Sequence, residues 1–351
     1  MAINQSTTVR PTTLPEDIEV WKMCQGLAAC PGNSAGRRAA VHRSPFAGTA
    51  FGGRWHLRSA LRRGGFVVGC RMPRSVLIAG CGFVGLPLAR SFVSSGWETH
   101  AITASKTSAA NLHGEPFSAY AADITERTSW GHFAGRRFDV VVHCASSGRG
   151  DASRYAAVFF AGTQNLMAHL DYGRLIFSSS TSVYAQTDGS WVDETSPADP
   201  VRETSRILRK TEDLVLGSGG TVARLAGLYG PGRCAPLQKV LDGRAMIEED
   251  GRRTLNALHG LDAARALQFL AATKSSGLFN VVDNQPLAEI DWFRYICHRL
   301  NKPLPPVGPR DSNRKRGWTN KRVSNRKLRL LGWDPIYPTF KEGVSSLLAQ
   351  D

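Results

Sequence analysis

Short apolar runs alternate with amphipathic stretches along the chain from residue 74 onward. The apolar runs are too short for most helices and predict buried strands at 75–79, 99–103, 119–122, 138–144 and 174–180. Between them, the residue pattern predicts helices at 86–94 and 155–170. Strands that alternate with helices in this way predict a doubly wound α/β fold, in which a parallel sheet carries helices on both faces.

The first predicted strand is followed at once by a glycine-rich turn and then by a helix. The turn has the spacing GxGxxG and consists of Gly80, Cys81, Gly82, Phe83, Val84 and Gly85. Gly80 permits the tight turn, Gly82 lets the backbone approach a pyrophosphate, and Gly85 lets helix and strand pack closely. The spacing alone could belong to an ordinary glycine-rich turn. In the order strand, turn, helix it predicts a Rossmann domain whose helix N-terminus binds the phosphates of NAD or NADP.

The end of the second strand indicates which dinucleotide is bound. A site selective for NAD places Asp or Glu there to accept hydrogen bonds from the ribose, whereas this chain has Ser105 and Lys106. A cation beside hydroxyls suits the 2′-phosphate of NADP, so NADP is favoured over NAD; alternatively, Lys106 is a solvated loop residue. Asp123 follows the third strand and could approach the adenine. Ala145 and Ser146 follow the fourth strand and are expected to pass beneath the nicotinamide-side ribose and phosphates.

Further motifs resemble the extended short-chain dehydrogenase/reductase superfamily, which includes NAD-dependent epimerases and dehydratases. Besides the glycine turn, they are FSSSTSVY at 177–184, RLAGLYGPGR at 224–233, LHGLD at 258–262 and FNVVDNQP at 279–286. The resemblance covers the chain from Arg74 to its C-terminus. It implies an NAD(P)-binding Rossmann domain over residues 72–230. Residues 231–351 are then mainly a substrate lobe, with late sheet elements around 278–283.

The same resemblance implies which positions should carry the catalytic residues. In this superfamily a Ser or Thr at the end of the fifth strand works with a Tyr that exchanges a proton with the substrate and a Lys four residues later. Ser180 matches the first member. Counting back from Glu212, which resembles the family's glutamate on the following helix, places Thr204 and Leu208 where Tyr and Lys are expected. A threonine hydroxyl is too weak an acid to replace the phenol. These departures resemble the atypical YeeZ-like branch of the superfamily.

Four further side chains are candidates for the site. Tyr184 is the phenol near Ser180 in sequence and could act as an acid or base, or could be a buried aromatic anchor. The resemblance implies that Arg233, after the Tyr-Gly-Pro-Gly loop, holds a substrate phosphate. Lys321 and Arg322 lie in a basic run and could grip an anionic substrate over the nicotinamide. Each of these three cations could instead be a solvated surface residue.

Two functions remain open from these residues. The first is an atypical NADP-dependent oxidoreductase or epimerase-like enzyme that acts on a small, anionic substrate, with Ser180 orienting the reacting oxygen. The second is a catalytically silent protein that binds NADP and reports its redox state to a partner, a function that the missing Tyr/Lys pair favours.

The basic charge of the chain is concentrated in part in an N-terminal extension. Lys and Arg number 44 against 29 Asp and Glu, a net charge of +15, and residues 1–71 hold ten basic and three acidic side chains. We expect this extension to be unstructured. It is either an organelle pre-sequence or translated sequence upstream of the functional start codon, in which case Met72 is the first residue of the functional protein. A nucleic-acid-binding arm is disfavoured, because no binding module accompanies its arginines.

The remaining sequence features concern the redox state of the cysteines, membrane insertion and the number of domains. Seven scattered cysteines show no ligand spacing and predict reduced thiols, no metal site and a cytoplasmic protein, unless residues 1–71 direct import into an organelle. No uninterrupted apolar stretch reaches the roughly 18 residues of a membrane span, so a span is excluded. The length suits one large domain with a smaller appendage, and we expect a monomer or homodimer that acts on a small molecule.

Overall fold

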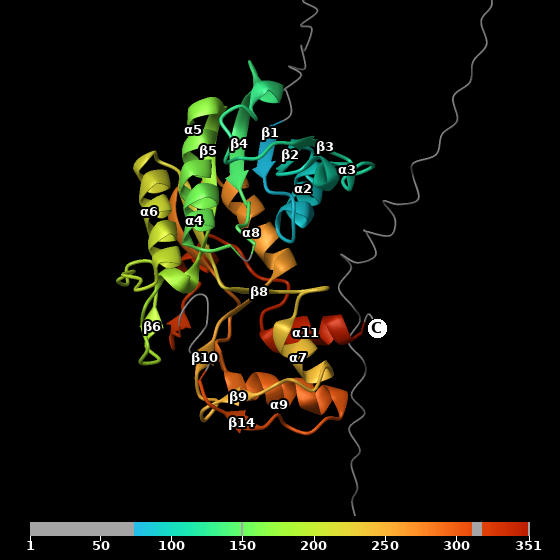
Figure 1. The fold of residues 1–351 in the computed structure, drawn as a ribbon, viewed down its shortest axis with the longest axis vertical. Coiled ribbons are helices and arrows are strands. Elements are labelled where there is room, and N and C mark those ends of the chain that lie inside the picture. The colour runs from blue at the N-terminus through green and yellow to red at the C-terminus, as the bar shows by residue number, and fades with distance from the viewer. Residues whose placement is uncertain (1–73, 149, 311–317, 350–351) are drawn as a thin grey trace, which may run out of the picture. The chain divides into compact units, whose positions relative to one another are not determined.

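A seven-stranded sheet lies at the centre of the molecule (Figure 1). The computed structural model describes residues 74–148, 150–310 and 318–349, so the predicted extension over residues 1–71 lies outside the described part. In spatial order the strands, all parallel, are β12 (Gly277–Val281), β7 (Thr221–Leu225), β5 (Asp171–Ser180), β4 (Arg137–His143), β1 (Ser75–Ala79), β2 (Glu98–Thr103) and β3 (Ser118–Ala121). The strand order changes direction between β1 and β4, which confirms the predicted doubly wound Rossmann fold.

Helices cover both faces of this sheet. On one face α2 (Gly85–Ser94) packs against α8 (Gly260–Ala272). On the opposite side in Figure 1 lie α4 (Ala152–Tyr155), the π-helical segment η2 (Ala156–Ala161), α5 (Gly162–His169) and α6 (Glu203–Gly217). Because both faces are covered, the middle residues of the central strands are mostly apolar and almost completely buried, as at Leu77 and Ile78 of β1, Val141 and Val142 of β4 and Ile176 of β5. No helix within the described residues is both long and apolar enough to cross a membrane.

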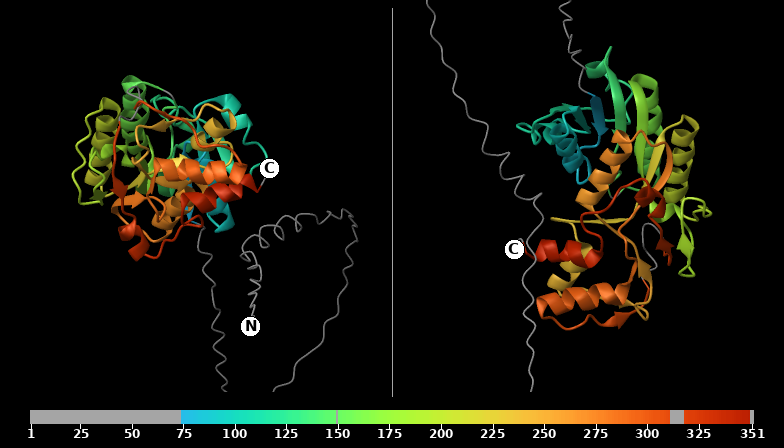
Figure 2. Two further views of the ribbon diagram at one scale, coloured as in Figure 1. Left: turned by 90° about the horizontal axis from the view of Figure 1, so that it is seen from below. Right: turned by 180° about the vertical axis from the view of Figure 1, so that it is seen from behind.

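A second, smaller core forms from α7 (Ala235–Leu241), α9 (Glu289–Leu300) and α11 (Phe340–Leu348). Trp292 of α9 stacks on Phe340 of α11 with ring centroids 3.7 Å apart, and Figure 2 shows these two helices side by side. The chain after residue 231 is shared between the two cores, because α8, β12 and α10 (Arg326–Leu330) pack with the large sheet.

Short elements connect and border the two cores. Four two-stranded pairings join β8 (Gly227–Tyr229) to β11 (Ala257–His259), β9 (Ile247–Glu248) to β14 (Val307–Gly308), β10 (Thr254–Leu255) to β13 (Leu287–Ala288), and β6 (Trp191–Val192) to β15 (Arg322–Val323). Three short helices complete the fold: α3 (Lys106–Ala110), η1 (Gly131–Phe133) and η3 (Thr181–Val183).

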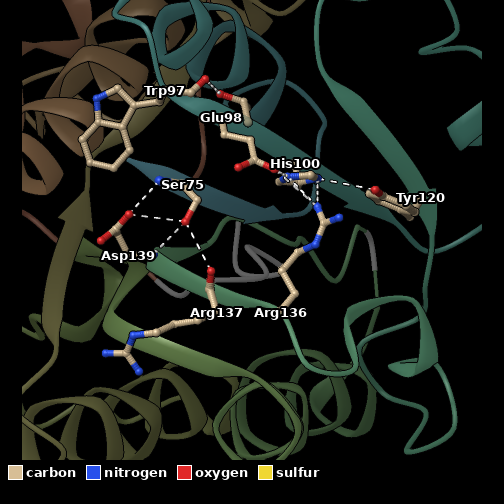
Figure 3. A network of polar contacts seen from close by, with 9 residues as sticks. Ser75, Trp97, Glu98, His100, Tyr120, Arg136, Arg137 and Asp139 are labelled. Atoms are coloured by element: carbon tan, nitrogen blue, oxygen red, sulfur yellow. Dashed lines mark hydrogen bonds and ion pairs between the residues drawn. The ribbon is translucent and has the colours of Figure 1, made fainter. Parts of the chain in front are cut away.

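Polar contacts tie the amino ends of the central strands together (Figure 3). The backbone N–H of Ser75, at the start of β1, donates to the Asp139 carboxylate on β4 at 2.7 Å. On β2, His100 Nε2 lies 2.9 Å from the Glu98 carboxylate and 2.9 Å from the Arg136 guanidinium. With the amino ends occupied in this way, the carboxyl ends of the strands are the edge at which a ligand can approach the sheet.

Candidate functional site

The three glycines of the turn after β1 have different surroundings. Gly80 has a φ of +99°, and a Cβ added to it would lie 2.4 Å from the Ala145 Cα. A Cβ on Gly85 would lie 2.0 Å from the carbonyl oxygen of Gly80, so helix α2 can approach β1 only with glycine there. A Cβ on Gly82 would meet nothing within 4 Å. Two glycines therefore serve the packing of the turn, whereas the middle one borders open space.

A cavity of about 220 Å³, the larger of two beside this turn and called the main cavity below, lies at the carboxyl ends of the central strands. Its walls come from the turn itself, from residues 144–146 after β4, from the end of β7, from Tyr155 and Phe159, from Leu208 on α6, from Arg233, and from Ser178, Ser179 and Ser180 at the end of β5. This is the place at which open α/β sheets bind their ligands, because the loops after neighbouring strands diverge where the strand order changes direction.

A small cavity of about 40 Å³ continues the groove on the other side of the turn. The ends of β2 and β3 line it, and it shares Gly80, Ala145 and Ser146 with the main cavity. Asp123 lines it as well, with its Oδ1 accepting hydrogen bonds from the N–H and hydroxyl of Thr125 at 2.9 and 2.8 Å. The two cavities therefore meet at the glycine turn, as the two halves of a dinucleotide would require.

The other two residues predicted for the adenosine side do not line the small cavity. Ser105 instead caps α3, with its hydroxyl oxygen accepting from the Ser108 N–H at 3.1 Å. Lys106, the first residue of α3, is exposed. The cavity wall on this strand ends at Ala104, so both residues lie just beyond it.

The two thiols near the groove are protonated, and Cys81 is buried whereas Cys144 is half-buried. Burial raises the pKa of Cys81, in the glycine turn, and of Cys144, in the wall of the main cavity, to about 12 in each case. All four cysteines in the described part of the chain are free. A protonated thiol is a weak nucleophile, so these two side chains contribute to the packing of the site.

Three consecutive serines at the end of β5 border the main cavity, and each has a different environment. The Ser178 hydroxyl donates to the His143 carbonyl oxygen at 2.8 Å, and the Ser179 hydroxyl donates to Glu212 at 2.5 Å. Ser180 begins the short helix η3 and accepts from the Ser182 N–H at 3.2 Å. The three hydroxyl groups therefore differ in their hydrogen-bond partners, although all three serines border the same cavity.

A buried ion pair lies beneath these serines. Glu212 of α6 is fully buried, and Arg224 of β7 is 2% exposed. The guanidinium donates to both Glu212 oxygens, with the shortest contact at 2.6 Å and a second at 3.0 Å. Since Ser179 lines the cavity and donates to the same carboxylate, the ion pair holds the end of β5 together with helix α6 and β7.

Tyr184 is a buried anchor in this structure. Its ring packs under the Arg224 guanidinium, 4.7 Å from the ring centroid, and its side chain is fully buried. The hydroxyl lies 2.7 Å from the Asp193 carbonyl oxygen and 3.0 Å from Asn280 Oδ1. Burial raises the pKa of Tyr184 above its ordinary value. The phenol does not line the main cavity that Ser180 borders, so the geometry favours the anchoring alternative.

The helix that should carry the superfamily's Tyr/Lys pair carries neither here. Leu208 is 3% exposed and lines the main cavity, at the position where counting from Glu212 places the lysine. Thr204, one turn earlier on α6, has a buried hydroxyl without a hydrogen-bond partner among the described residues. An apolar wall therefore occupies the place of the expected cation.

Of the three cations predicted to bind substrate, one lies at the main cavity. Arg233 lines it and stacks on Phe83 of the glycine turn, 5.0 Å from the ring centroid. Lys321 is buried elsewhere: its ammonium donates to the Thr319 hydroxyl at 2.8 Å, and burial lowers its pKa to about 8. Arg322 is exposed and donates to the Gly189 carbonyl oxygen at 3.0 Å.

Sequence reasoning missed the residues that the helix after β4 brings to the groove. Tyr155 and Phe159 line the main cavity, and Arg154 lines the small one. Tyr155 and Phe159 are four residues apart, a spacing that places two aromatic rings on one helix face. That spacing was a usable signal, but nothing in the sequence says which face points to the ligand.

The strand order, the glycine turn with its open middle position and the strand-end serine beside a cavity together define a dinucleotide-binding protein of the short-chain dehydrogenase/reductase class. The chain belongs to the NAD dependent epimerase/dehydratase family, whose family model matches residues 76–281.

Individual relatives agree with this assignment. The chain is 32% identical over 225 residues to Protein YeeZ from Escherichia coli K12, an alignment that covers 59% of this chain and 77% of that protein. A solved structure from Methylobacillus flagellatus, named as an NAD-dependent epimerase/dehydratase, is 28% identical, with a TM-score of 0.66 over 79% of this chain and 98% of that one. Helicobacter pylori ADP-L-glycero-D-manno-heptose-6-epimerase shares the fold at 18% identity and a TM-score of 0.67, covering 79% and 96% of the two chains.

Proposed function

We propose that this protein is an NADP-dependent oxidoreductase or epimerase-like enzyme that acts on a small, anionic substrate. The observation that carries the proposal is the pair of cavities that meet at Gly80 and Ala145 along the carboxyl ends of the strands. The small cavity lies on the side where the adenosine would bind, the open space at Gly82 lies where the pyrophosphate would bind, and the main cavity lies where the nicotinamide would bind with a substrate beside it. The dinucleotide would supply or accept a hydride there.

The side chains that line the main cavity would then orient the substrate and bind its anionic group. Ser180 orients the reacting oxygen of the substrate by a hydrogen bond. Arg233 contacts an anionic group of the substrate. Leu208 supplies no charge that could lower the pKa of a neighbouring hydroxyl, and the Tyr184 hydroxyl is bonded elsewhere. The proton therefore comes from water or from the substrate itself.

Fluorescence titration of the full chain with NADPH, NADP⁺, NADH and NAD⁺ at one salt concentration tests the cofactor. We expect both forms of NADP to bind more tightly than either form of NAD. Binding of none of the four would contradict the proposal.

A screen of carbonyl compounds for NADPH oxidation then tests catalysis. With any substrate found, Ser180→Ala should lower kcat at least tenfold, whereas Ser178→Ala, whose hydroxyl is bonded to the His143 carbonyl, should retain most of it. Equal turnover by Ser180→Ala and the unaltered protein would refute the role of Ser180.

A second candidate function rests on Leu208. A catalytically silent NADP-binding protein that reports redox state to a partner would need no cation at this position. Such a sensor must bind NADPH and NADP⁺ with different affinities in the absence of substrate, because differential affinity is what drives a conformational switch. A large difference in the same titration would favour the sensor, and comparable affinities with turnover in the screen would favour the enzyme.

A further inference from the structure

Arg154, on the helix after β4, lines the small cavity together with the end of β2. The first turn of this helix is fixed, because the Arg154 N–H donates to the Asp151 carboxylate at 2.9 Å. Gly150 lies so close that a Cβ added to it would be 2.5 Å from the Arg154 Cβ. The base of the side chain is thus held in place, while its end is exposed at the cavity.

The small cavity is lined by two charged side chains of opposite sign. Among the residues that line it, Arg154 is the one cation and Asp123 the one acid. Asp123 belongs to the loop after β3 and its Oδ1 is bonded to Thr125. The end of β2 contributes Thr103 and Ala104, so no carboxylate stands there to accept hydrogen bonds from two ribose hydroxyls.

The Arg154 guanidinium is available to a ligand. It forms no hydrogen bond or ion pair with another described residue, whereas Arg90 and Arg137 on the same domain are both paired with carboxylates. A guanidinium binds phosphate oxygens through two parallel hydrogen bonds, and a cavity wall that brings one near the ribose edge favours a ribose that carries phosphate.

We propose that Arg154 is the specificity-determining residue for the dinucleotide and binds the 2′-phosphate of NADP. This inference rests on the proposed function, in which the small cavity holds the adenosine. It transfers the role expected for Lys106 to Arg154, because Arg154 lines the cavity and Lys106 does not.

The test compares the dissociation constants of NADPH and NADH for the full chain and for the variants Arg154→Ala, Arg154→Lys and Lys106→Ala. The unaltered protein should prefer NADPH. Arg154→Ala should weaken NADPH binding tenfold or more and change NADH binding less than twofold, and Arg154→Lys should restore part of the loss. Lys106→Ala, the matched removal of a nearby exposed cation, should leave both constants within about twofold. A second readout, which does not involve the nicotinamide, compares how well 2′,5′-ADP and 5′-ADP compete with NADPH for binding, since the two nucleotides differ in the 2′-phosphate.

Three results would overturn the assignment. Equal losses for NADPH and NADH in Arg154→Ala would place this side chain at the pyrophosphate or the adenine. A loss of NADPH preference in Lys106→Ala alone would return the role to Lys106. Equal binding of NADH and NADPH by the unaltered protein would remove the specificity altogether. Failure to bind any dinucleotide would instead refute the proposed function itself, so the two failures are distinguishable. Thermal melting of each variant verifies that it is folded.

Discussion

The three glycines of the turn after β1 allow one chemical change, glycine to alanine, to separate cofactor binding from folding. At Gly82 the added methyl group meets nothing within 4 Å, and φ is not in the left-handed region. Gly82→Ala should therefore fold normally and be as stable as the unaltered protein or more stable by about 0.4–1 kcal/mol, because alanine reduces the entropy of the unfolded chain. The same methyl group occupies the space proposed for the pyrophosphate, so NADPH binding should weaken at least tenfold, or about 1.4 kcal/mol.

At Gly85 the expected result is reversed. The added Cβ would lie 2.0 Å from the Gly80 carbonyl oxygen, far inside any normal contact distance. The obstacle is backbone, so it cannot rotate away, and relief requires α2 to move off β1. Overpacking of this kind costs about 3 kcal/mol, a large part of the total stability of a domain. We expect a clear fall in the urea midpoint of unfolding for Gly85→Ala.

The assays are urea unfolding followed by tryptophan fluorescence and NADPH titration on each variant. Gly131→Ala is the control, because its methyl group also meets nothing within 4 Å but lies far from the glycine turn in sequence, in η1. It should leave NADPH binding unchanged and have the same small effect on stability as Gly82→Ala. NADPH binding by Gly82→Ala equal to that of the unaltered protein would refute the placement of the pyrophosphate. Full stability of Gly85→Ala would refute the packing argument.

Three further predictions concern buried groups. Glu212→Gln leaves the buried Arg224 without its carboxylate and should lower the free energy of unfolding by about 3–5 kcal/mol, whereas a loss below about 1 kcal/mol, as at an exposed pair, would show that the pair is not desolvated. The Cys144 thiol, with its pKa raised to about 12, should react with iodoacetamide far more slowly in the native protein than in urea, as measured by peptide mass mapping; equal rates would contradict the raised pKa. Burial lowers the pKa of His143 from 6.5 to about 4, so the unfolded chain takes up this proton first. The free energy of unfolding should therefore fall by up to about 3 kcal/mol as the pH falls from 6.5 to 4. In His143→Asn this pH dependence of the free energy of unfolding should disappear, as measured by urea unfolding at several pH values. An unchanged slope would refute the assignment.

Part of the site was predictable because its signals are local. The glycine spacing between a strand and a helix identified the turn, and Asp123, Ala145, Ser146 and Ser180 all line the groove, since each lies at or within three residues of the carboxyl end of a strand. The end of β2 was predicted less well. Ser105 lies just past the cavity wall, because its hydroxyl caps a helix that begins there.

Side chains that reach the groove from helices and distant loops could not be placed from the sequence. Lys321 and Arg233 both belong to segments with the right charge, yet only Arg233 lines the main cavity, because β15 pairs with β6 and carries its neighbours away from it. Tyr184 is four residues from Ser180 and nevertheless points to Asn280 on β12.

By itself the sequence determined the alternation of strands and helices, the glycine turn and the replacement of the Tyr/Lys pair by Thr204 and Leu208, because each depends on residues close together in the chain. The tertiary structure decided which cations and phenols reach the groove, and so brought Arg154 to the small cavity and withheld Tyr184 from the main one. The physical reason is that a side chain's neighbours depend on which strands pair and which helix face packs against the sheet, and both are settled by contacts between residues far apart in sequence.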